Sequence, residues 1–164
     1  MSDRIEGIVE RVRAFMDSDV YTLEQHRNQK AFYALLPQLE KAASAADPAR
    51  VINIGSIDGL HVPDLETYAY SASKAAVHHL TRVLAKKLAA KRITVNAVAP
   101  GPFESKMMAQ TLRSFGKLIV EACPLKRIGE PEDMAGVTLF LASRAGAYVT
   151  GAVIPVDGGL ATTV

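Results

Sequence analysis

Two short runs of aliphatic and β-branched residues, with a long helical stretch between them, constrain the fold of this 164-residue chain more than any other feature. The runs cover residues 51–54 and 93–98, and both suit strands that are buried within a sheet. Residues 67–91, which lie between them, carry apolar side chains at helical spacing. Because strands joined by a helix pair in parallel through a right-handed crossover, the pattern predicts an α/β fold with a parallel sheet.

The rest of the chain predicts further elements of the same kind. Residues 131–142 predict a helix that begins with proline and two acidic residues, and residues 153–156 predict a third strand. Residues 105–120 predict a helix that is broken near Gly116. Towards the N-terminus, amphipathic helices are expected over residues 5–16 and 23–46, the second of them kinked by its proline.

The charge balance and the hydropathy exclude several classes of protein. The formal net charge is only +2, from 19 basic and 17 acidic residues, which gives no electrostatic basis for nucleic-acid binding. No run reaches the roughly 18 apolar residues that a membrane span needs. The single cysteine, Cys123, cannot form an internal disulfide and fits a reducing compartment. We therefore expect a cytoplasmic globular protein of one domain.

A tyrosine, a lysine and a serine form the most informative set of polar residues. Lys74 follows Tyr70 by four positions, so the two side chains share one face if this stretch is helical. An ammonium beside a phenol favours the phenolate, and a phenol tuned in this way can act as a general acid or base. Ser56 follows the predicted strand over 51–54, where its hydroxyl could hold a substrate oxygen. We expect these three side chains to form a catalytic set.

Other residues with chemistry of their own have a simpler interpretation. His78 and His79 lack a further ligand at metal-binding spacing, so no metal site is expected. His61 is interpreted as a surface histidine of the loop after Ser56. Cys123 is interpreted as a small buried apolar side chain, because no histidine lies near it in the sequence.

Five blocks of the sequence resemble the C-terminal half of the short-chain dehydrogenase/reductase family. Within the family they are most similar to 3-oxoacyl-acyl-carrier-protein reductases, including those associated with rhamnolipids. The resemblance implies a partial Rossmann-like fold: a doubly wound parallel sheet of about three strands with flanking helices, without the N-terminal strands. It covers residues 28–164 and leaves residues 1–27 as a separate helical segment outside the family. The five blocks are residues 50–56, 70–74, 93–101, 127–133 and 150–159.

The resemblance also implies a role for each residue of the catalytic set. Tyr70 would protonate a carbonyl oxygen as a hydride arrives, or deprotonate an alcohol in the reverse direction. Lys74 would support the phenolate and hold the ribose hydroxyls of a nicotinamide cofactor. Ser56 would hydrogen-bond the substrate oxygen. Asn28 would position a water molecule and link Lys74 to a proton relay.

The cofactor implied by the resemblance is NADP or NAD, bound by Tyr70, Lys74 and a second group of residues. The substrate implied is a small carbonyl or alcohol compound, and the subgroup implies a 3-oxoacyl substrate. The helix predicted over 67–91 would pack against a second copy of the chain and form a homo-oligomer. The second group of cofactor residues comprises Pro100, Gly101 and Phe103, which would border the nicotinamide, and Ser105, which would face its carboxamide.

One expected feature is missing from the sequence: a glycine-rich loop that would bind the pyrophosphate of the cofactor. Gly55 and Gly59 form the only close pair before Gly101, and their spacing does not match such a loop. The family's strand that distinguishes NADP from NAD is absent as well, so we expect impaired oxidoreductase activity in the isolated chain. Two alternatives stay open: a non-catalytic assembly protein that retains the dimer helix, and a truncated or fused gene product.

Overall fold

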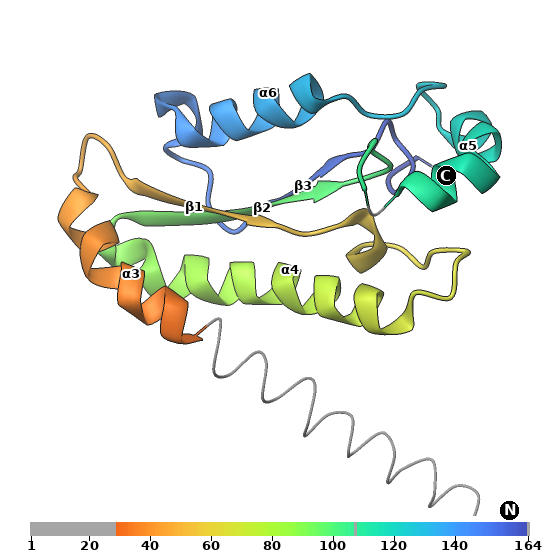
Figure 1. Ribbon diagram of the computed structural model, residues 1–164. Helices are drawn as coiled ribbons and strands as arrows, with labels where there is room; N and C mark the ends of the chain where they lie inside the picture. Colours follow the sequence, from red (N-terminus) through yellow and green to blue (C-terminus); the bar gives the residue numbers. More distant parts are fainter. Residues whose placement is uncertain (1–28, 107, 164) are drawn as a thin grey trace, which may run out of the picture. The chain divides into compact units, whose positions relative to one another are not determined.

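The computed structural model describes residues 29–106 and 108–163, which Figure 1 draws as coloured ribbon. The chain divides into two units, Met1–Lys41 and Ala42–Val164. The described part of the first unit lies in helix α3, Gln29–Ala42, which continues through Pro37. The helix predicted over 23–46 is therefore confirmed in its described part, although it ends earlier than expected. The helix predicted over 5–16 lies outside the described residues.

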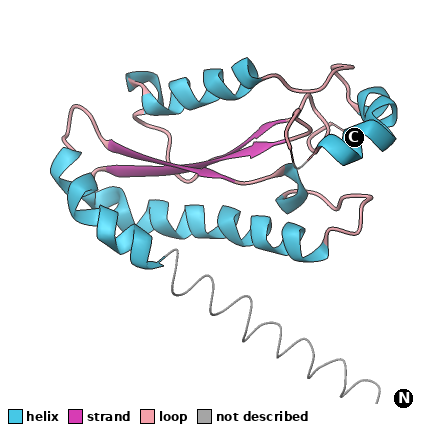
Figure 2. Ribbon diagram, in the orientation of Figure 1, coloured by secondary structure: helices cyan, strands magenta, loops and turns pink. Residues whose placement is uncertain are grey.

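The second unit is built on a parallel sheet of three strands in the order β1-β2-β3. The strands are β1 (Ala49–Ile54), β2 (Ile93–Pro100) and β3 (Val153–Val156). Helix α4, Tyr68–Leu88, covers one face of the sheet, and helix α6, Pro131–Ala142, covers the other (Figure 1, Figure 2). The predicted parallel sheet with flanking helices is confirmed.

Strand β2 supplies the centre of the core, because it pairs on both sides and is covered on both faces. Its polar residue Asn96 is 1% exposed, and both polar atoms of its side chain have a hydrogen-bond partner. The amide nitrogen Nδ2 donates to the carbonyl of Val149 at 2.8 Å, and Oδ1 accepts from the N–H of Ala152 at 3.0 Å. A buried amide without these partners would be costly, so Asn96 fixes the segment that leads into β3. Four residues of β2 have no exposed surface: Val95, Ala97, Val98 and Ala99.

Helix α4 packs on the sheet through a stripe of residues three or four positions apart. The stripe consists of His78, Thr81, Ala85 and Leu88, all of them buried. Thr81 Oγ1 accepts a hydrogen bond from Asn53 Nδ2 at 2.9 Å, which joins the helix to β1. The helical stretch continues through η4, Ala89–Lys91, and ends at Arg92, whose φ of 58° is left-handed. The helix predicted over 67–91 is therefore confirmed.

Helix α5, Ala109–Ala122, differs from the prediction because it starts later and runs unbroken through Gly116. A glycine weakens a helix by about 1 kcal/mol relative to alanine, which is too little to end it when the neighbouring residues favour it. Ahead of the helix, Ser105 Oγ accepts a hydrogen bond from the N–H of Met108 at 3.2 Å. This bond stabilises a turn ahead of the helix.

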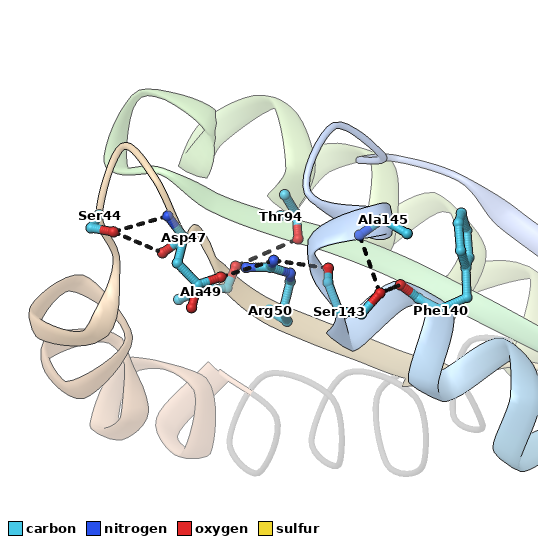
Figure 3. A network of polar contacts seen from close by, with 8 residues as sticks. All are labelled: Ser44, Asp47, Ala49, Arg50, Thr94, Phe140, Ser143 and Ala145. Atoms are coloured by element: carbon cyan, nitrogen blue, oxygen red, sulfur yellow. Dashed lines mark hydrogen bonds and ion pairs between the residues drawn. The ribbon is translucent and has the colours of Figure 1, made fainter.

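Arg50 ties the beginning of β1 to the end of α6 (Figure 3). Its Nη2 donates to the carbonyl of Ser143 at 3.0 Å and lies 3.0 Å from a carboxylate oxygen of Asp47. Ser143 caps the C-terminus of α6, where carbonyl groups lack helical partners and a cation is favourable. Arg50 Nε is buried without a hydrogen-bond partner among the described residues, which reduces the net benefit.

Arg50→Met keeps the apolar stem of the side chain and removes both interactions. We expect the free energy of unfolding to fall by about 1–2 kcal/mol, because a charge-assisted hydrogen bond is lost. Urea unfolding followed by circular dichroism measures the change. Arg144→Met, which alters an exposed arginine of η5 (Arg144–Gly146), is the matched control and should change stability little. Equal losses in the two variants would contradict the role of the Arg50 contacts.

The beginning of α6 is fixed by the carboxylate of Asp133. This carboxylate accepts two hydrogen bonds from the Arg127 guanidinium, at 2.6 and 2.8 Å, and one from the N–H of Glu130 at 2.8 Å. The bonds to Arg127 make the largest contribution, and together the contacts lower the pKa of Asp133 from 3.8 to about 2. The ionised form therefore stabilises the folded chain above pH 3.8, and this stabilisation is lost as the pH falls towards about 2.

Asp133→Asn should remove this pH dependence. We expect the thermal midpoint of the wild-type chain to fall more steeply than that of the variant as the pH drops from 3.8 to about 2. Calorimetry at a series of pH values measures both curves. Glu132→Gln, in the same turn of α6, is the control and should follow the wild type. Parallel curves for the wild type and Asp133→Asn would show that this carboxylate does not stabilise the folded state.

Candidate active site

Ser56 lies just beyond the carboxyl end of β1 and is 6% exposed. Its Oγ accepts a hydrogen bond from the N–H of Asp58 at 3.2 Å, so it caps the short helix η3, Ile57–Gly59. Its carbonyl accepts from the N–H of Gly59 at 3.1 Å. Because the bond at Oγ uses a lone pair, the hydroxyl hydrogen can still be donated to a substrate oxygen.

Tyr70 and Lys74 lie in the first two turns of α4, and the predicted contact between them is present. Lys74 Nζ lies 5.4 Å from the centre of the Tyr70 ring. The same ammonium donates a hydrogen bond to the carbonyl of Ile54, the last residue of β1, at 3.2 Å. The structure therefore brings Lys74 to the end of the strand from which the Ser56 turn begins. Lys74 thus links the Tyr70 ring to the end of β1, and these two residues with Ser56 are called the cluster at the end of β1.

A second set of contacts holds the start of α4 against η3. Thr67, which precedes α4, donates from Oγ1 to the carboxylate of Asp58 at 3.4 Å. Its Oγ1 also lies 3.0 Å from the hydroxyl oxygen of Ser71. Thr67 and Asp58 were not among the residues that the sequence singled out, because their contact joins a loop to a helix end across nine positions. The sequence prediction made Thr67 the first residue of the helix, whereas the structure places it at the N-cap position just before α4.

The residues expected to border a nicotinamide follow β2. Pro100 ends this strand opposite Val156, and Gly101 donates its N–H to the Val156 carbonyl at 2.9 Å. Gly101 has no room for a side chain, since an added Cβ would lie 2.7 Å from Asp157 Cβ. Phe103 forms an isolated parallel β-bridge with Gly129. Ser105 is exposed, and its Oγ accepts a hydrogen bond from the N–H of Met108. Pro100 and Gly101 are thus held by β3, whereas Ser105 caps the turn before α5.

The remaining sequence predictions concern residues that do not belong to the cluster at the end of β1, or that lie outside the described residues. Asn28 lies outside the described residues. His78 is 2% exposed, whereas its neighbour His79 is exposed, and no group of three metal-ligating side chains occurs within residues 29–106 and 108–163. Cys123 is buried, and its thiol lies 3.6 Å from the carbonyl of Gly158.

None of the helices in the described part combines the length and the apolar character needed to cross a bilayer.

A cavity of about 450 Å³ lies next to Phe103. Its walls contain neither Ser56 nor Tyr70 nor Lys74, so it is distinct from the cluster at the end of β1. The cavity is mostly apolar. Of its three charged residues, Arg127 and Asp133 are paired with each other, and the carboxylate of Asp157 accepts the N–H groups of Gly159 and Ala161. The cavity shares Phe103 with the residues expected to border a nicotinamide, but none of the three residues of the expected catalytic set lines it.

Comparison with known proteins gives a consistent result. Residues 9–161 match the family described as enoyl-(acyl carrier protein) reductase. This match begins within residues 1–27, which were predicted to be a helical segment outside the family. The boundary between that segment and the family portion at residue 28 stays a prediction. The chain is 49% identical over 127 residues to the rhamnolipids biosynthesis 3-oxoacyl-[acyl-carrier-protein] reductase of Pseudomonas aeruginosa, covering 76% of this chain and 50% of that protein. It is 38% identical to 3-oxoacyl-[acyl-carrier-protein] reductase FabG of the same organism, covering 81% and 53%.

The solved structures agree with the sequence relatives. The Pseudomonas aeruginosa RhlG/NADP active-site complex superposes with a TM-score of 0.76 at 46% identity, over 79% of this chain and 52% of that chain. The chain thus spans about half the length of the relatives that it matches. With the parallel sheet, its flanking helices and these identities together, the chain belongs to the short-chain dehydrogenase/reductase family.

Proposed function

We propose that the cluster at the end of β1 is the catalytic site of an NAD(P)-dependent oxidoreductase that reduces a carbonyl or oxidises an alcohol. The observation that carries this proposal is the position of Lys74, whose ammonium contacts both the Tyr70 ring and the carbonyl end of β1. The substrate class proposed is a 3-oxoacyl thioester, because the relatives include 3-oxoacyl-[acyl-carrier-protein] reductases.

The residues present fit one half of the cofactor. The ammonium of Lys74 has N–H groups beyond the one given to Ile54, and these suit the hydroxyls of a ribose. Pro100, Gly101, Phe103 and Ser105 are proposed to border the nicotinamide ring. For the pyrophosphate half, the sequence offers no glycine-rich loop before a helix. We therefore propose that the isolated chain binds NADP or NAD weakly and has low activity.

Each catalytic side chain has a separate part in the proposed reaction. Bound NADPH or NADH would supply a hydride to the carbonyl carbon. Tyr70 donates its phenolic proton to the carbonyl oxygen as negative charge develops there. Lys74 stabilises the phenolate that remains, and Ser56 donates a hydrogen bond to the same substrate oxygen. Asn28 is proposed to position a water that returns a proton towards Lys74.

A second candidate function, assembly of two copies of the chain, rests on an exposed stripe along α4. The stripe residues are three or four positions apart, so they share one helix face, and all are exposed. Small side chains at this spacing allow a second helix to approach closely. We propose that the stripe packs against its symmetry mate. The stripe consists of Ala69, Ala72, Ala76, Leu80 and Val83.

Tyr70→Phe tests the catalytic proposal, because it removes the proton donor and keeps the ring. We expect the rate of acetoacetyl-CoA reduction at saturating NADPH to fall by about 10²–10⁴-fold, with little change in cofactor affinity. Absorbance of NADPH measures the rate, and nicotinamide fluorescence measures binding. Tyr68→Phe is the matched control, since Tyr68 lies in the same turn and is 76% exposed. A Tyr70→Phe variant as active as the wild type would refute the assignment.

The same titration tests the proposed weakness of cofactor binding. We expect NADPH and NADH to saturate the chain only well above micromolar concentration, since the contacts to the pyrophosphate are missing. Saturation at micromolar cofactor would refute the weak-binding proposal and leave the catalytic assignment standing.

Ala76→Arg tests the assembly proposal. A long charged side chain in the centre of the stripe should prevent close packing of two helices, so the wild-type chain should sediment as a dimer and the variant as a monomer. Analytical ultracentrifugation distinguishes the two. Ala90→Arg, at an exposed position of η4, is the control and should leave the dimer intact. A monomeric wild-type chain would rule out this candidate.

A further inference from the structure

His78 occupies an unusual position for a histidine that takes no part in the proposed chemistry. It follows Tyr70 and Lys74 at four-residue steps on α4, so the three side chains share one helix face. Unlike the other two it is almost fully buried, with 2% of its surface exposed. Its ring nitrogen Nδ1 lies 3.3 Å from the carbonyl of Gly59. The imidazole therefore connects the helix of Tyr70 to the turn that carries Ser56.

The turn is shaped to receive this ring. A Cβ at Gly55 would lie 2.1 Å from His78 Nε2, and a Cβ at Gly59 would lie 2.9 Å from His78 Cε1. A side chain at Gly55 would therefore displace the imidazole, whereas one at Gly59 would meet the backbone of Lys74 and Ala75 at 2.7 Å as well as the ring. Gly55 precedes Ser56 and Gly59 is the last residue of η3, so the ring lies against both ends of the 55–59 turn.

We propose that His78 is a positioning residue, which holds the 55–59 turn and thereby sets where the Ser56 hydroxyl lies relative to Tyr70. This inference deepens the proposed function, and its catalytic consequence rests on that function. Two other contacts anchor the turn from outside it, one at Gly55 and one between Asp58 and Thr67. Gly55 donates to the carbonyl of Val98 at 2.7 Å, which fixes the strand end, and Ser56 Oγ itself is bonded only within the turn.

The protonation state of His78 matters for this contact. Because a carbonyl oxygen only accepts hydrogen bonds, Nδ1 carries the hydrogen and Nε2 is unprotonated in the neutral ring. Nε2 is buried and has no hydrogen-bond partner among the described residues. A proton added to Nε2 would place an N–H against Gly55 with no acceptor, which is costly in a buried site.

Burial and the neighbouring positive charges also favour the neutral form of the His78 ring. Burial is the largest effect and lowers the pKa of His78 below 6.5. The hydrogen bond to the Gly59 carbonyl raises this pKa and partly offsets the effect of burial. The positive charges of Arg82 and Lys74, on the same helix, lower the pKa further. Asp58, the acidic group of η3, faces Thr67. Because the folded pKa lies below the unfolded one, the neutral ring stabilises the turn above pH 6.5, and this is lost as the pH falls below that value.

The decisive experiment follows the ¹⁵N-labelled full chain by NMR from about pH 7.5 to about pH 5. We expect the amide signals of Ser56 and Gly59 to shift with the same midpoint as the His78 ring, below 6.5. These shifts should vanish in His78→Leu and persist in His79→Leu, the matched control at the exposed neighbour. The proposal would be overturned if the Ser56 and Gly59 amide signals did not shift over the pH range in which His78 titrates. It would also be overturned if the same shifts remained in His78→Leu.

Kinetics provide the second readout. His78→Leu should lower kcat by about 10–100-fold and leave NADPH affinity within about twofold, since a displaced Ser56 affects the reacting atoms and not the cofactor. His78→Asn keeps a hydrogen-bond donor for the Gly59 carbonyl, so its kcat should be higher than that of His78→Leu. If His78→Leu does not fold, His78→Asn is compared with the wild type in its place. Equal kcat in all variants would overturn the proposal. A wild-type chain without reductase activity would refute the proposed function, while the NMR titration would still decide whether His78 holds the turn.

Discussion

The complete burial of β2 is the constraint on which the rest of the second unit depends. A strand that is paired on both sides and covered on both faces cannot expose its polar groups to water, so each must find a partner within the protein. Asn96 meets this requirement through Val149 and Ala152, and in doing so it sets the path of the chain into β3. With β2 fixed, the ends of β1 and β2 lie side by side, and the residues that follow them are held together. The candidate site is thus a consequence of how the sheet is buried.

Much of this arrangement could be predicted from the sequence, and the remainder has identifiable physical reasons. Apolar strands separated by helices leave few alternatives to a parallel sheet, and the four-residue step from Tyr70 to Lys74 is enough to predict their contact. The continuity of α5 through Gly116 was not predicted, because the cost of one glycine is small. The burial of His78 was not predicted either. It depends on two glycines about twenty positions away that leave space for a ring, and no local pattern records such a fit.

Lys74 illustrates how one side chain can serve the fold and the proposed chemistry together. Its hydrogen bond to Ile54 satisfies a carbonyl at the end of β1, and the same bond limits the freedom of a long, flexible side chain. An ammonium held in this way need not be ordered again when a substrate or cofactor arrives, so less entropy is lost on binding. The contact with the Tyr70 ring follows from the same placement. Anchoring by the strand and orientation of the phenol are therefore coupled.

The side-chain contacts at the candidate site join β1, η3 and α4, and the backbone of Gly55 adds a bond to β2. Ser56 depends on η3, Lys74 on the end of β1, and the Ser56 turn on His78. None of these contacts involves a pyrophosphate-binding loop, so the geometry of the cluster and the affinity for a dinucleotide are physically separable. The proposed site can therefore combine a positioned cation and hydroxyl with the weak cofactor binding that is proposed above. For that reason turnover and cofactor affinity must be measured independently, because weak binding alone says nothing about whether the catalytic groups are in place.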